Sequence, residues 1–334
     1  MSRVLGLDDA RALAAAVLAA HGTSEVNARA TAAALVAAEA DGLASHGLSR
    51  LPAYADQARA GKVDGHATPV VDRPKPGAVR VDAATGFAFP ALDAGLPVLE
   101  SATRALGVAG MAIANSHHFG VAGHPVERLA RAGLVGLAFA NSPAAIAPWG
   151  GARPLFGTNP VAMACPRGAG ADPLVVDMSL SKVARGKVMV AARKGEAIPD
   201  DWALDAGGRP TTDPAAALKG SMLPMGDAKG AALVLAVEIL ATAFTGAAFG
   251  FEASSFFDAE GPPPRVGQLV LAIAPDAFGT EGVVDRVETL LAAMGEEPDV
   301  RVPGARRFAA RRHAEAEGIA IPDDLADELA RRAA

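Results

Sequence analysis

Residues 41–50 read DGLASHGLSR and place a histidine, two serines and an arginine directly after a long predicted helix. Ser24 is a suitable N-cap, and the alanine-rich run after it has helical propensity as far as Glu39, so this helix should end near Gly42. His46 is therefore expected in a loop or at a fresh helix start. Because imidazole has an ordinary pKa near neutrality, a rigidly held histidine here can deliver a proton to a developing alkoxide.

The end of the same stretch offers a binding group. Arg50 follows His46 at a spacing of four, so a resumed helix would put both side chains on one face, where the guanidinium can fork onto a carboxylate. A structural interpretation competes with this one: His46 ends the helix and only bonds a backbone carbonyl. The motif alone favours the structural interpretation.

Composition excludes several classes of protein. A length of 334 residues suggests two or three domains, and the 51% of hydrophobic residues are mainly small or aliphatic, as in a globular protein. A net charge of -6 without a long basic block argues against a nucleic-acid partner. The single cysteine, Cys165, excludes an intrachain disulfide and a cysteine-rich zinc site, and it suits a reducing compartment.

No membrane partner is expected. The first ten residues, MSRVLGLDDA, carry acids and are unlike a secretory signal, so we expect a cytoplasmic protein. Only residues 230–251 have membrane length. This run contains Glu238 and several small residues, and we interpret it as a buried helix in a soluble protein.

The remaining pattern mixes helices and strands. Helices are expected at 7–20, 51–60, 91–105, 125–132, 284–292, 303–317 and from 322 onward. Strands are expected at 79–82, 107–114, 134–141, 161–165, 174–176 and 268–273. The sequence contains no G-x-G-x-x-G, phosphate-loop, G-x-S-x-G or H-E-x-x-H motif. A dinucleotide, if bound, must be held without the Rossmann signature.

Polar residues at the ends of predicted elements are further candidates. His117 and His118 should point to opposite faces, so they are poorly placed to bind one metal ion, and no metal site is predicted. Asp177 ends an apolar strand and is either a helix N-cap or a partner for a base; the sequence alone favours the cap. Lys229 lies between glycines at a predicted helix N-terminus, which suits an anion or a solvated helix start equally.

Six stretches occur in an order typical of one family: DGLASHGLSRLPAY, NSHHFG, GGARPLFGTNP, VVDMSLS, MGDAKG and VPGARR. Together they resemble the malate/L-sulfolactate dehydrogenase-like family of NAD(P)-dependent oxidoreductases. This family includes sulfolactate and malate dehydrogenases and the Δ1-piperideine-2-carboxylate/Δ1-pyrroline-2-carboxylate reductases. Each motif is weak alone, but the resemblance covers essentially the whole chain.

The resemblance implies an α/β (α+β) L-sulfolactate dehydrogenase-like fold. Its nucleotide-binding domain is not Rossmann-like and has a largely antiparallel sheet, which accounts for the missing glycine motif. A helical domain with the catalytic histidine would be built from 1–75 and 304–334, a central α/β domain from 76–118 and 262–303, and an NAD(P)-binding domain from 119–261. The resemblance also implies a homodimer.

Site residues follow from the same resemblance. It implies that His46 is the general acid, with Ser45 beside it and Asp177 as its electrostatic or orienting partner. Arg50 and Thr158 are implied to contact the substrate carboxylate, and the role of His117 is left undecided. The implied cofactor contacts are His118, Gly120, Ser179, Leu180, Ser181, Lys182, Ala228, Lys229, Gly304, Ala305 and Arg306.

The expected reaction is hydride transfer between a nicotinamide and C2 of a small 2-oxo or 2-hydroxy acid of the lactate, malate or sulfolactate type. A cyclic ketimine reductase is the alternative enzyme, and a non-catalytic dinucleotide-binding protein is the alternative of another class. Lys182, Arg185 and Lys187 could grip a 2′-phosphate or form a solvated face. NADP(H) is favoured over NAD(H).

Overall fold

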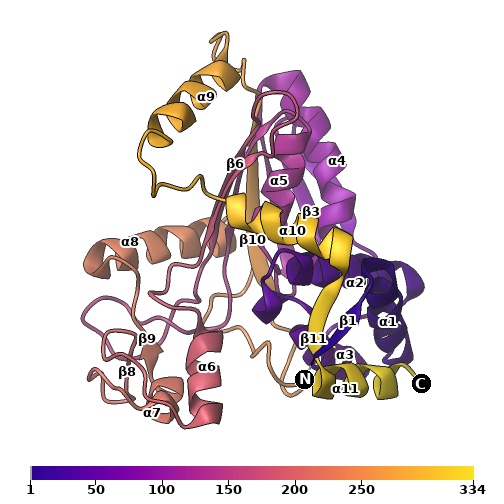
Figure 1. Ribbon diagram of the computed structural model, residues 1–334, viewed down its shortest axis with the longest axis vertical. Coiled ribbons are helices and arrows are strands. Elements are labelled where there is room, and N and C mark those ends of the chain that lie inside the picture. The colour runs from indigo at the N-terminus through magenta and orange to yellow at the C-terminus, as the bar shows by residue number, and fades with distance from the viewer. Residues whose placement is uncertain (1) are drawn as a thin grey trace.

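The computed structural model describes residues 2–334, and its helical lobe is built from both ends of the chain (Figure 1). β1 (Ser2–Leu5) pairs antiparallel with β11 (Ile319–Pro322), so the N-terminal and C-terminal segments lie side by side. The helices of this lobe are α1 (Leu7–Ala20), α2 (Glu25–Ala40), α3 (Leu51–Arg59), α10 (Ala305–Glu317) and α11 (Asp323–Ala333). This arrangement confirms the predicted helical part from both termini.

A seven-stranded sheet forms the centre, in the order β2-β3-β4-β10-β5-β6-β7. Only β3 and β4 run parallel, and every other neighbouring pair is antiparallel, which confirms the predicted largely antiparallel sheet. The strands are β2 (Val70–Lys75), β3 (Ala78–Asp82), β4 (Val108–Ser116), β5 (Val135–Ala140), β6 (Val161–Cys165), β7 (Leu174–Met178) and β10 (Val266–Ile273).

Helices cover both faces of this sheet. On one face α4 (Ala88–Leu106) packs on β3 and β4, and α5 (Gly123–Arg131) packs on β5 and β6. On the other face α8 (Asp227–Glu238), continued by the π-helical η3 (Ile239–Ala243), contacts β5. Successive side chains of β5 point to opposite faces of the sheet. Gly136 therefore abuts α5, whereas Phe139 packs on the other side, against a separate apolar core that includes Val234 of α8.

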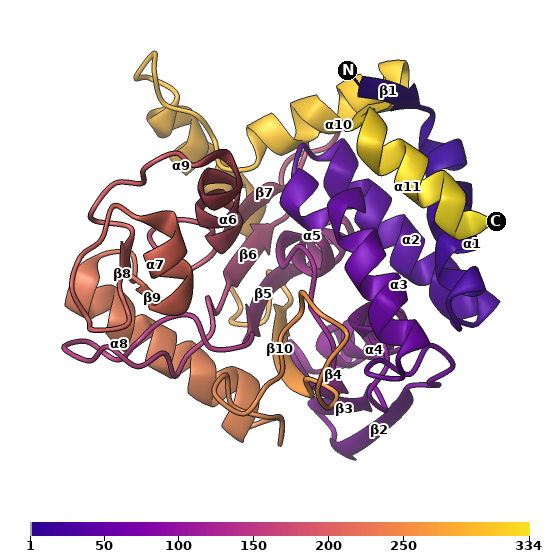
Figure 2. The same cartoon turned by 90° about the horizontal axis from the view of Figure 1, so that it is seen from below.

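A second, smaller lobe has its own apolar core, which includes Ile146, Leu180, Val188, Met222 and Val234. Its elements are α6 (Arg185–Lys194), β8 (Ala203–Leu204), α7 (Pro214–Lys219) and β9 (Ser221–Met222), and α9 (Val283–Met294) lies above it in the view of Figure 1. Figure 2 shows this lobe and the helical lobe on opposite sides of β5, β6 and β7. The three-domain division with its residue boundaries stays a prediction.

The interpretation of 230–251 as one buried helix is wrong. The helical segment begins at Asp227 and ends at Ala243. It exposes apolar side chains such as Leu235, which is 47% exposed, and Phe244, which directly follows the segment, is 70% exposed. Within residues 2–334, no helix combines the length and the hydropathy that crossing a membrane requires. The strands β1, β2 and β11 were not predicted, because a run of four to six residues at a sheet edge is too short to give a clear pattern.

Candidate active site

The stretch 41–50 forms two short 3₁₀ turns after α2. The chain reverses at Gly42, where φ is +75°, and continues as η1 (Ala44–His46) and η2 (Leu48–Arg50). The predicted helix end near Gly42 is therefore confirmed, and His46 is the last residue of a 3₁₀ turn within a loop rather than the start of a helix. A continuous helix from His46 to Arg50 is not formed, because Gly47 interrupts it.

Glu39 supports this turn from the last turn of α2. Its carboxylate accepts a 2.8 Å hydrogen bond from the backbone N–H of Leu48. A Cβ at Gly47 would lie 2.1 Å from Glu39 Oε2, so a larger residue would displace this carboxylate from Leu48. Arg50 closes the loop by donating from Nε to the carbonyl of Ser45 at 2.8 Å. The stretch therefore has one defined shape that holds His46 at its centre.

A cavity of about 530 Å³ opens beside this loop, within the size range of small-molecule sites. Its walls come from the helical lobe, the ends of β5 and β7, the start of α6 and the loop at 250–257. The predicted site residues that line it are Ser45, His46, Arg50, His118, Gly120, Thr158, Asp177 and Ser179. With Arg307, which ends VPGARR and also lines the cavity, residues from five of the six motifs meet in one place.

His46 is held from both sides. Its Nδ1 shares a 3.0 Å hydrogen bond with Ser45 Oγ, and its ring stacks on His118 with centroids 5.5 Å apart. No group within residues 2–334 hydrogen-bonds Nε2, so the structural interpretation, a bond to a carbonyl, is wrong. Burial and the charge of Arg50 lower the pKa of His46 to about 4, although Asp177 opposes this shift.

The two adjacent histidines diverge, as predicted. His118 faces the cavity, and its Nδ1 shares a 2.6 Å hydrogen bond with the hydroxyl of Tyr54. His117 is 1% exposed and bonds Gln57 Oε1 through Nε2 at 2.8 Å. Burial lowers the pKa of both imidazoles, so both are neutral near pH 7. His117 packs behind the site and does not line the cavity.

Arg50 lines the cavity and has an N–H donor that makes no hydrogen bond within residues 2–334. Its guanidinium stacks on Phe257 at 4.5 Å from the ring centroid, and its buried Nη1 has no hydrogen-bond partner among the described residues. Burial lowers the pKa of Arg50. A desolvated cation with a free N–H suits an anionic ligand. Thr158, the other predicted carboxylate contact, adds a hydroxyl 3.4 Å from Ser142 Oγ in the same cavity.

Asp177 is not the N-cap of the next helix, because the N-cap of α6 is Ala184. Its Oδ2 instead accepts a 3.0 Å hydrogen bond from the N–H of Gly123, at the start of α5, and a 2.7 Å bond from Arg307. It reaches His46 through its charge rather than through a hydrogen bond. Arg307 was missed by the sequence analysis, although it directly follows the predicted Arg306.

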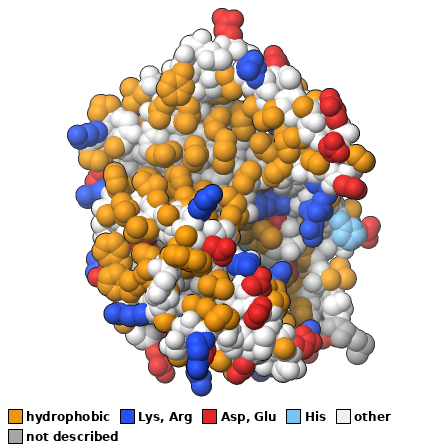
Figure 3. Space-filling model, turned by 90° about the vertical axis from the view of Figure 1, so that its left-hand side faces the viewer, with side chains coloured by type: hydrophobic (Ala, Val, Ile, Leu, Met, Phe, Trp, Pro, Cys, Tyr) orange, Lys and Arg blue, Asp and Glu red, His pale blue; other side chains and the backbone are white. Residues whose placement is uncertain are grey.

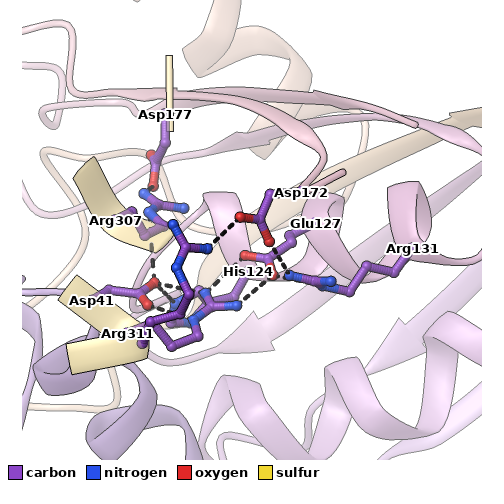
Figure 4. Close-up of polar contacts among 9 residues, drawn as sticks. Asp41, His124, Glu127, Arg131, Asp172, Asp177, Arg307 and Arg311 are labelled. Carbon is purple, nitrogen blue, oxygen red and sulfur yellow. Dashed lines mark hydrogen bonds and ion pairs between the residues drawn. The ribbon is translucent and has the colours of Figure 1, made fainter. Parts of the chain in front are cut away.

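A buried ion network extends from this pair (Figure 4). Arg307 Nε lies 3.6 Å from Asp41, whose carboxylate also binds Arg311 and His124. Arg311 in turn binds Glu127 of α5. Nothing in the sequence marks Asp41 as buried, although it opens the DGLASHGLSR stretch. The network couples the start of the loop that carries His46 to the Asp177 side of the cavity.

Other predicted cofactor residues lie outside the cavity. Leu180 and Ser181 are buried behind Ser179, and Lys182 pairs with Asp201 at 2.8 Å. The rest begin two helices: Ala228 and Lys229 start α8, while Ala305 and Arg306 start α10 after Gly304.

These helix starts fit an anionic dinucleotide. Neither α8 nor α10 has a side-chain cap, so N–H groups in their first turns are available to phosphate oxygens, apart from that of Ala305, which bonds the carbonyl of Val302. Gly120 has φ +69°, and a Cβ there would lie 2.8 Å from the Phe89 ring, so the chain beside His118 needs glycine. Within residues 2–334, no cluster of three or more potential metal-binding side chains is found.

The fold and the site define an oxidoreductase, and the chain belongs to the malate/L-lactate dehydrogenase family, whose model matches residues 5–330. The predicted family resemblance is confirmed. The chain is 56% identical over 329 residues, 98% of each protein, to a (2R)-3-sulfolactate dehydrogenase (NADP(+)) of Chromohalobacter salexigens. It is 44% identical over 318 residues, 94% of this chain and 92% of the other, to a Δ1-pyrroline-2-carboxylate/Δ1-piperideine-2-carboxylate reductase of Pseudomonas putida.

Solved structures agree with this assignment. The crystal structure of Δ1-piperideine-2-carboxylate reductase from Pseudomonas syringae pvar. tomato matches with a TM-score of 0.93 at 38% identity, covering 99% of both chains. Sulfolactate dehydrogenase from Methanocaldococcus jannaschii matches with a TM-score of 0.90 at 31% identity, covering 99% of this chain and 96% of that one.

Proposed function

We propose that this protein is an NADP(H)-dependent oxidoreductase that interconverts a small 2-oxo acid and the corresponding 2-hydroxy acid, of the lactate, malate or sulfolactate type. One observation carries the proposal: His46 and the unpaired guanidinium of Arg50 line the same cavity. A proton donor and a carboxylate receptor are the two groups that such a reduction needs. The name of the sulfolactate dehydrogenase relative specifies NADP(+), which supports NADP(H) as the cofactor of this protein.

Substrate binding and proton delivery are coupled in this proposal. Arg50 binds the C1 carboxylate of the 2-oxo acid, and the Thr158 hydroxyl adds a second contact. The positive charge of Arg50 helps to hold the pKa of His46 at about 4, so a carboxylate that neutralises it raises that pKa. Substrate binding therefore favours the protonated imidazole that the reduction consumes.

A reduced nicotinamide, when bound, supplies hydride to C2 of the substrate. His46 gives its Nε2 proton to the carbonyl oxygen as negative charge develops there, and the 2-hydroxy acid results. The Ser45 hydroxyl on Nδ1 sets the orientation of the ring, and the negative charge of Asp177 stabilises the imidazolium before transfer. In the oxidation direction, the neutral imidazole accepts the hydroxyl proton.

The remaining predicted contacts would hold the dinucleotide. His118, Gly120 and Ser179 line the cavity, while the starts of α8 and α10 present backbone N–H groups to phosphates. Lys229 and Arg306 add positive charge at these two helix starts. Leu180, Ser181 and Lys182 continue from Ser179 along the same side.

A substrate panel tests the proposal. Oxidation of NADPH and of NADH is followed with pyruvate, oxaloacetate, sulfopyruvate and Δ1-piperideine-2-carboxylate. We expect NADPH to be preferred and a 2-oxo acid to be reduced fastest. The second candidate is a cyclic ketimine reductase, which the 44% identity to a named reductase favours, and turnover of the ketimine alone would support it. Tight dinucleotide binding without any turnover would instead indicate a non-catalytic binding protein.

Quaternary structure and location are also proposed. Apolar side chains gather on the face that carries α8 (Figure 3), and the exposed ones on this segment are Leu233, Leu235, Ile239 and Phe244. We define these four as the α8 apolar face. An apolar face of this kind suits burial against a second copy, so we infer a homodimer. A cytoplasmic location accords with the single buried cysteine.

A further inference from the structure

Arg185 is a cation of the cavity to which the reaction above gives no role. It is the first residue of α6 and lines the cavity together with its neighbours Ala184 and Gly186. A Cβ at Gly186 would lie 3.9 Å from Cβ of Ser45, so α6 begins directly against the catalytic loop. Arg185 is therefore on an element whose position is tied to that of His46.

The structure separates the three cations that the sequence groups together. Lys182 lies outside the cavity and pairs with Asp201 at 2.8 Å, and Lys187 is exposed. Arg185 alone lines the cavity and is half-buried. A shared role on one 2′-phosphate is therefore not supported by their arrangement, and Arg185 needs a separate explanation.

Arg185 has only weak partners. Its Nη1 and Nη2 donate to the carbonyls of Ala144 and Leu218 at 3.4 and 3.3 Å, both near the limit for a hydrogen bond. Across residues 2–334, no carboxylate lies within ion-pair distance of it, whereas Arg307 in the same cavity is paired with Asp177. Burial lowers the pKa of Arg185. A desolvated guanidinium without an anion is costly, so a ligand anion that pairs with it gains affinity.

Two arginines of one cavity can thus take up a ligand anion: among the described residues, Arg50 has a buried N–H without a partner, and Arg185 has two long hydrogen bonds to carbonyls and no carboxylate. A cyclic ketimine such as Δ1-piperideine-2-carboxylate carries a single carboxylate and would leave one guanidinium without a partner. A 2-oxo acid with a second acid group on C3 carries two anionic ends. The charge pattern of the cavity therefore favours a dianionic substrate.

We propose that Arg185 is a specificity-determining residue, which binds the acid group on C3 of a dianionic 2-oxo acid while Arg50 binds the C1 carboxylate. The inference rests on the proposed function and narrows its substrate class. The second acid is a carboxylate or a sulfonate, because a guanidinium fork fits the paired oxygens of either group. Monoanionic 2-oxo acids make no use of Arg185.

The test compares Arg185→Gln and Arg185→Lys with the unmodified enzyme. We measure kcat/KM for NADPH-dependent reduction of sulfopyruvate, oxaloacetate and pyruvate. Arg185→Gln should lower kcat/KM for the preferred dianion by about 10- to 100-fold, the value of a lost charge-assisted hydrogen bond, and should change pyruvate reduction by less than about threefold. Arg185→Lys should restore part of the loss. The dianion with the larger loss identifies sulfonate or carboxylate as the second group.

Lys219→Gln is the matched control. It removes one positive charge next to Leu218, whose carbonyl accepts from Arg185, but Lys219 is exposed and does not line the cavity. It should leave all three kcat/KM values unchanged, which excludes a general effect of net charge. Melting temperatures show whether each variant is folded. If Arg185→Gln does not fold, Arg185→Lys alone must still lower the ratio of kcat/KM for the dianion to kcat/KM for pyruvate.

Three results would overturn the inference alone: equal losses on all three substrates, no loss on any of them, or an increased KM for NADPH with unchanged discrimination. The last would assign Arg185 to a cofactor phosphate. Failure of the proposed function can be told apart from failure of the Arg185 inference, because it would be seen in the unmodified enzyme. That enzyme would then reduce Δ1-piperideine-2-carboxylate but none of the 2-oxo acids. That result would overturn both statements.

Discussion

Arg311 donates two hydrogen bonds, of 2.8 and 3.0 Å, to the carboxylate of Asp41, and so joins α10 to the C-terminal end of α2. The Asp41 side chain is 0% exposed, and it also bonds His124 Nε2 at 2.9 Å. A fully buried carboxylate needs such cations, and the cations in turn need it. This contact therefore anchors the residue that begins the catalytic stretch.

Replacement of Asp41 by asparagine should destabilise the protein by about 3–5 kcal/mol, because it leaves buried guanidinium groups without their anion. Urea denaturation measures the change in the free energy of unfolding. Glu25→Gln is the control, since it breaks only the exposed pair with Arg29 and should cost less than about 1 kcal/mol. Similar losses of unfolding free energy in the two variants would contradict the claim that the buried contacts of Asp41 are worth more than an exposed ion pair.

His46→Gln should lower kcat for 2-oxo acid reduction by about 10² to 10⁴, the usual contribution of a general acid. The KM for NADPH should stay close to that of the unmodified enzyme, since His46 acts on the substrate oxygen. His66→Gln, which changes an exposed histidine that does not line the cavity, provides the comparison. Full activity in His46→Gln would remove the assignment of the proton donor.

Two substitutions at Arg50 separate its two effects. Arg50→Lys keeps the charge but loses the fork, so the KM for the 2-oxo acid should rise by about 10- to 100-fold. Arg50→Gln should raise KM too, and because the Arg50 charge helps to lower the pKa of His46, removing it should raise that pKa. Oxidation needs neutral His46, so its acid limb should move to higher pH in Arg50→Gln only. Identical pH profiles for the two variants would be incompatible with this coupling.

Acid should destabilise the folded protein before the carboxylates titrate. Burial lowers the pKa of His46 to about 4 and of His117 to about 3, from an ordinary value of 6.5. Between pH 6.5 and 4 the unfolded chain binds protons that the folded chain does not, so the stability from these neutral histidines falls as pH falls. Each adds a slope of up to about 1.4 kcal/mol per pH unit.

Urea denaturation at a series of pH values measures this slope. His117→Gln should flatten the dependence of unfolding free energy on pH between 6.5 and 4, since it removes one of the buried imidazoles. His66→Gln, at an exposed position, is the comparison and should leave the slope near that of the unmodified protein. A slope that His117→Gln does not change would show that this imidazole is not held neutral.

Leu235→Glu should convert the inferred homodimer to a monomer, because it places a charge in the α8 apolar face. Analytical ultracentrifugation measures the mass in solution. Val26→Glu makes the same change at a side chain that is also exposed, 76%, but lies on α2, and it should leave the mass unchanged. A monomer in the unmodified protein, or a dimer in Leu235→Glu, would refute this interface.

Local signals in the sequence predicted the helices well. Ser24 caps α2 as expected, the helix stops before Gly42, and the strands at 161–165 and 268–273 lie where alternation indicates them. These features depend on residues within one or two turns of each other. The resemblance supplied the antiparallel sheet, which local patterns alone did not indicate.

Contacts between distant residues could not be predicted. Asp177 and Arg307 are 130 positions apart, and Tyr54 and His118 are 64 apart, so no spacing rule connects them. The three neighbouring cations Lys182, Arg185 and Lys187 also show that sequence position does not predict spatial contacts. Lys182 and Arg185 look equivalent in sequence, but the start of α6 turns Arg185 into the cavity and leaves Lys182 beside Asp201.

The pairing of β1 with β11 has a consequence during protein synthesis. In the lobe that carries His46, α1, α2 and α3 are synthesised long before α10, which supplies Arg307 and Arg311, and before β11, which completes the small sheet. This lobe cannot close until residues 305–322 have been translated. A nascent chain that stops before residue 305 therefore lacks the cations that hold Asp177 and Asp41, and its proton-donor loop is unfinished.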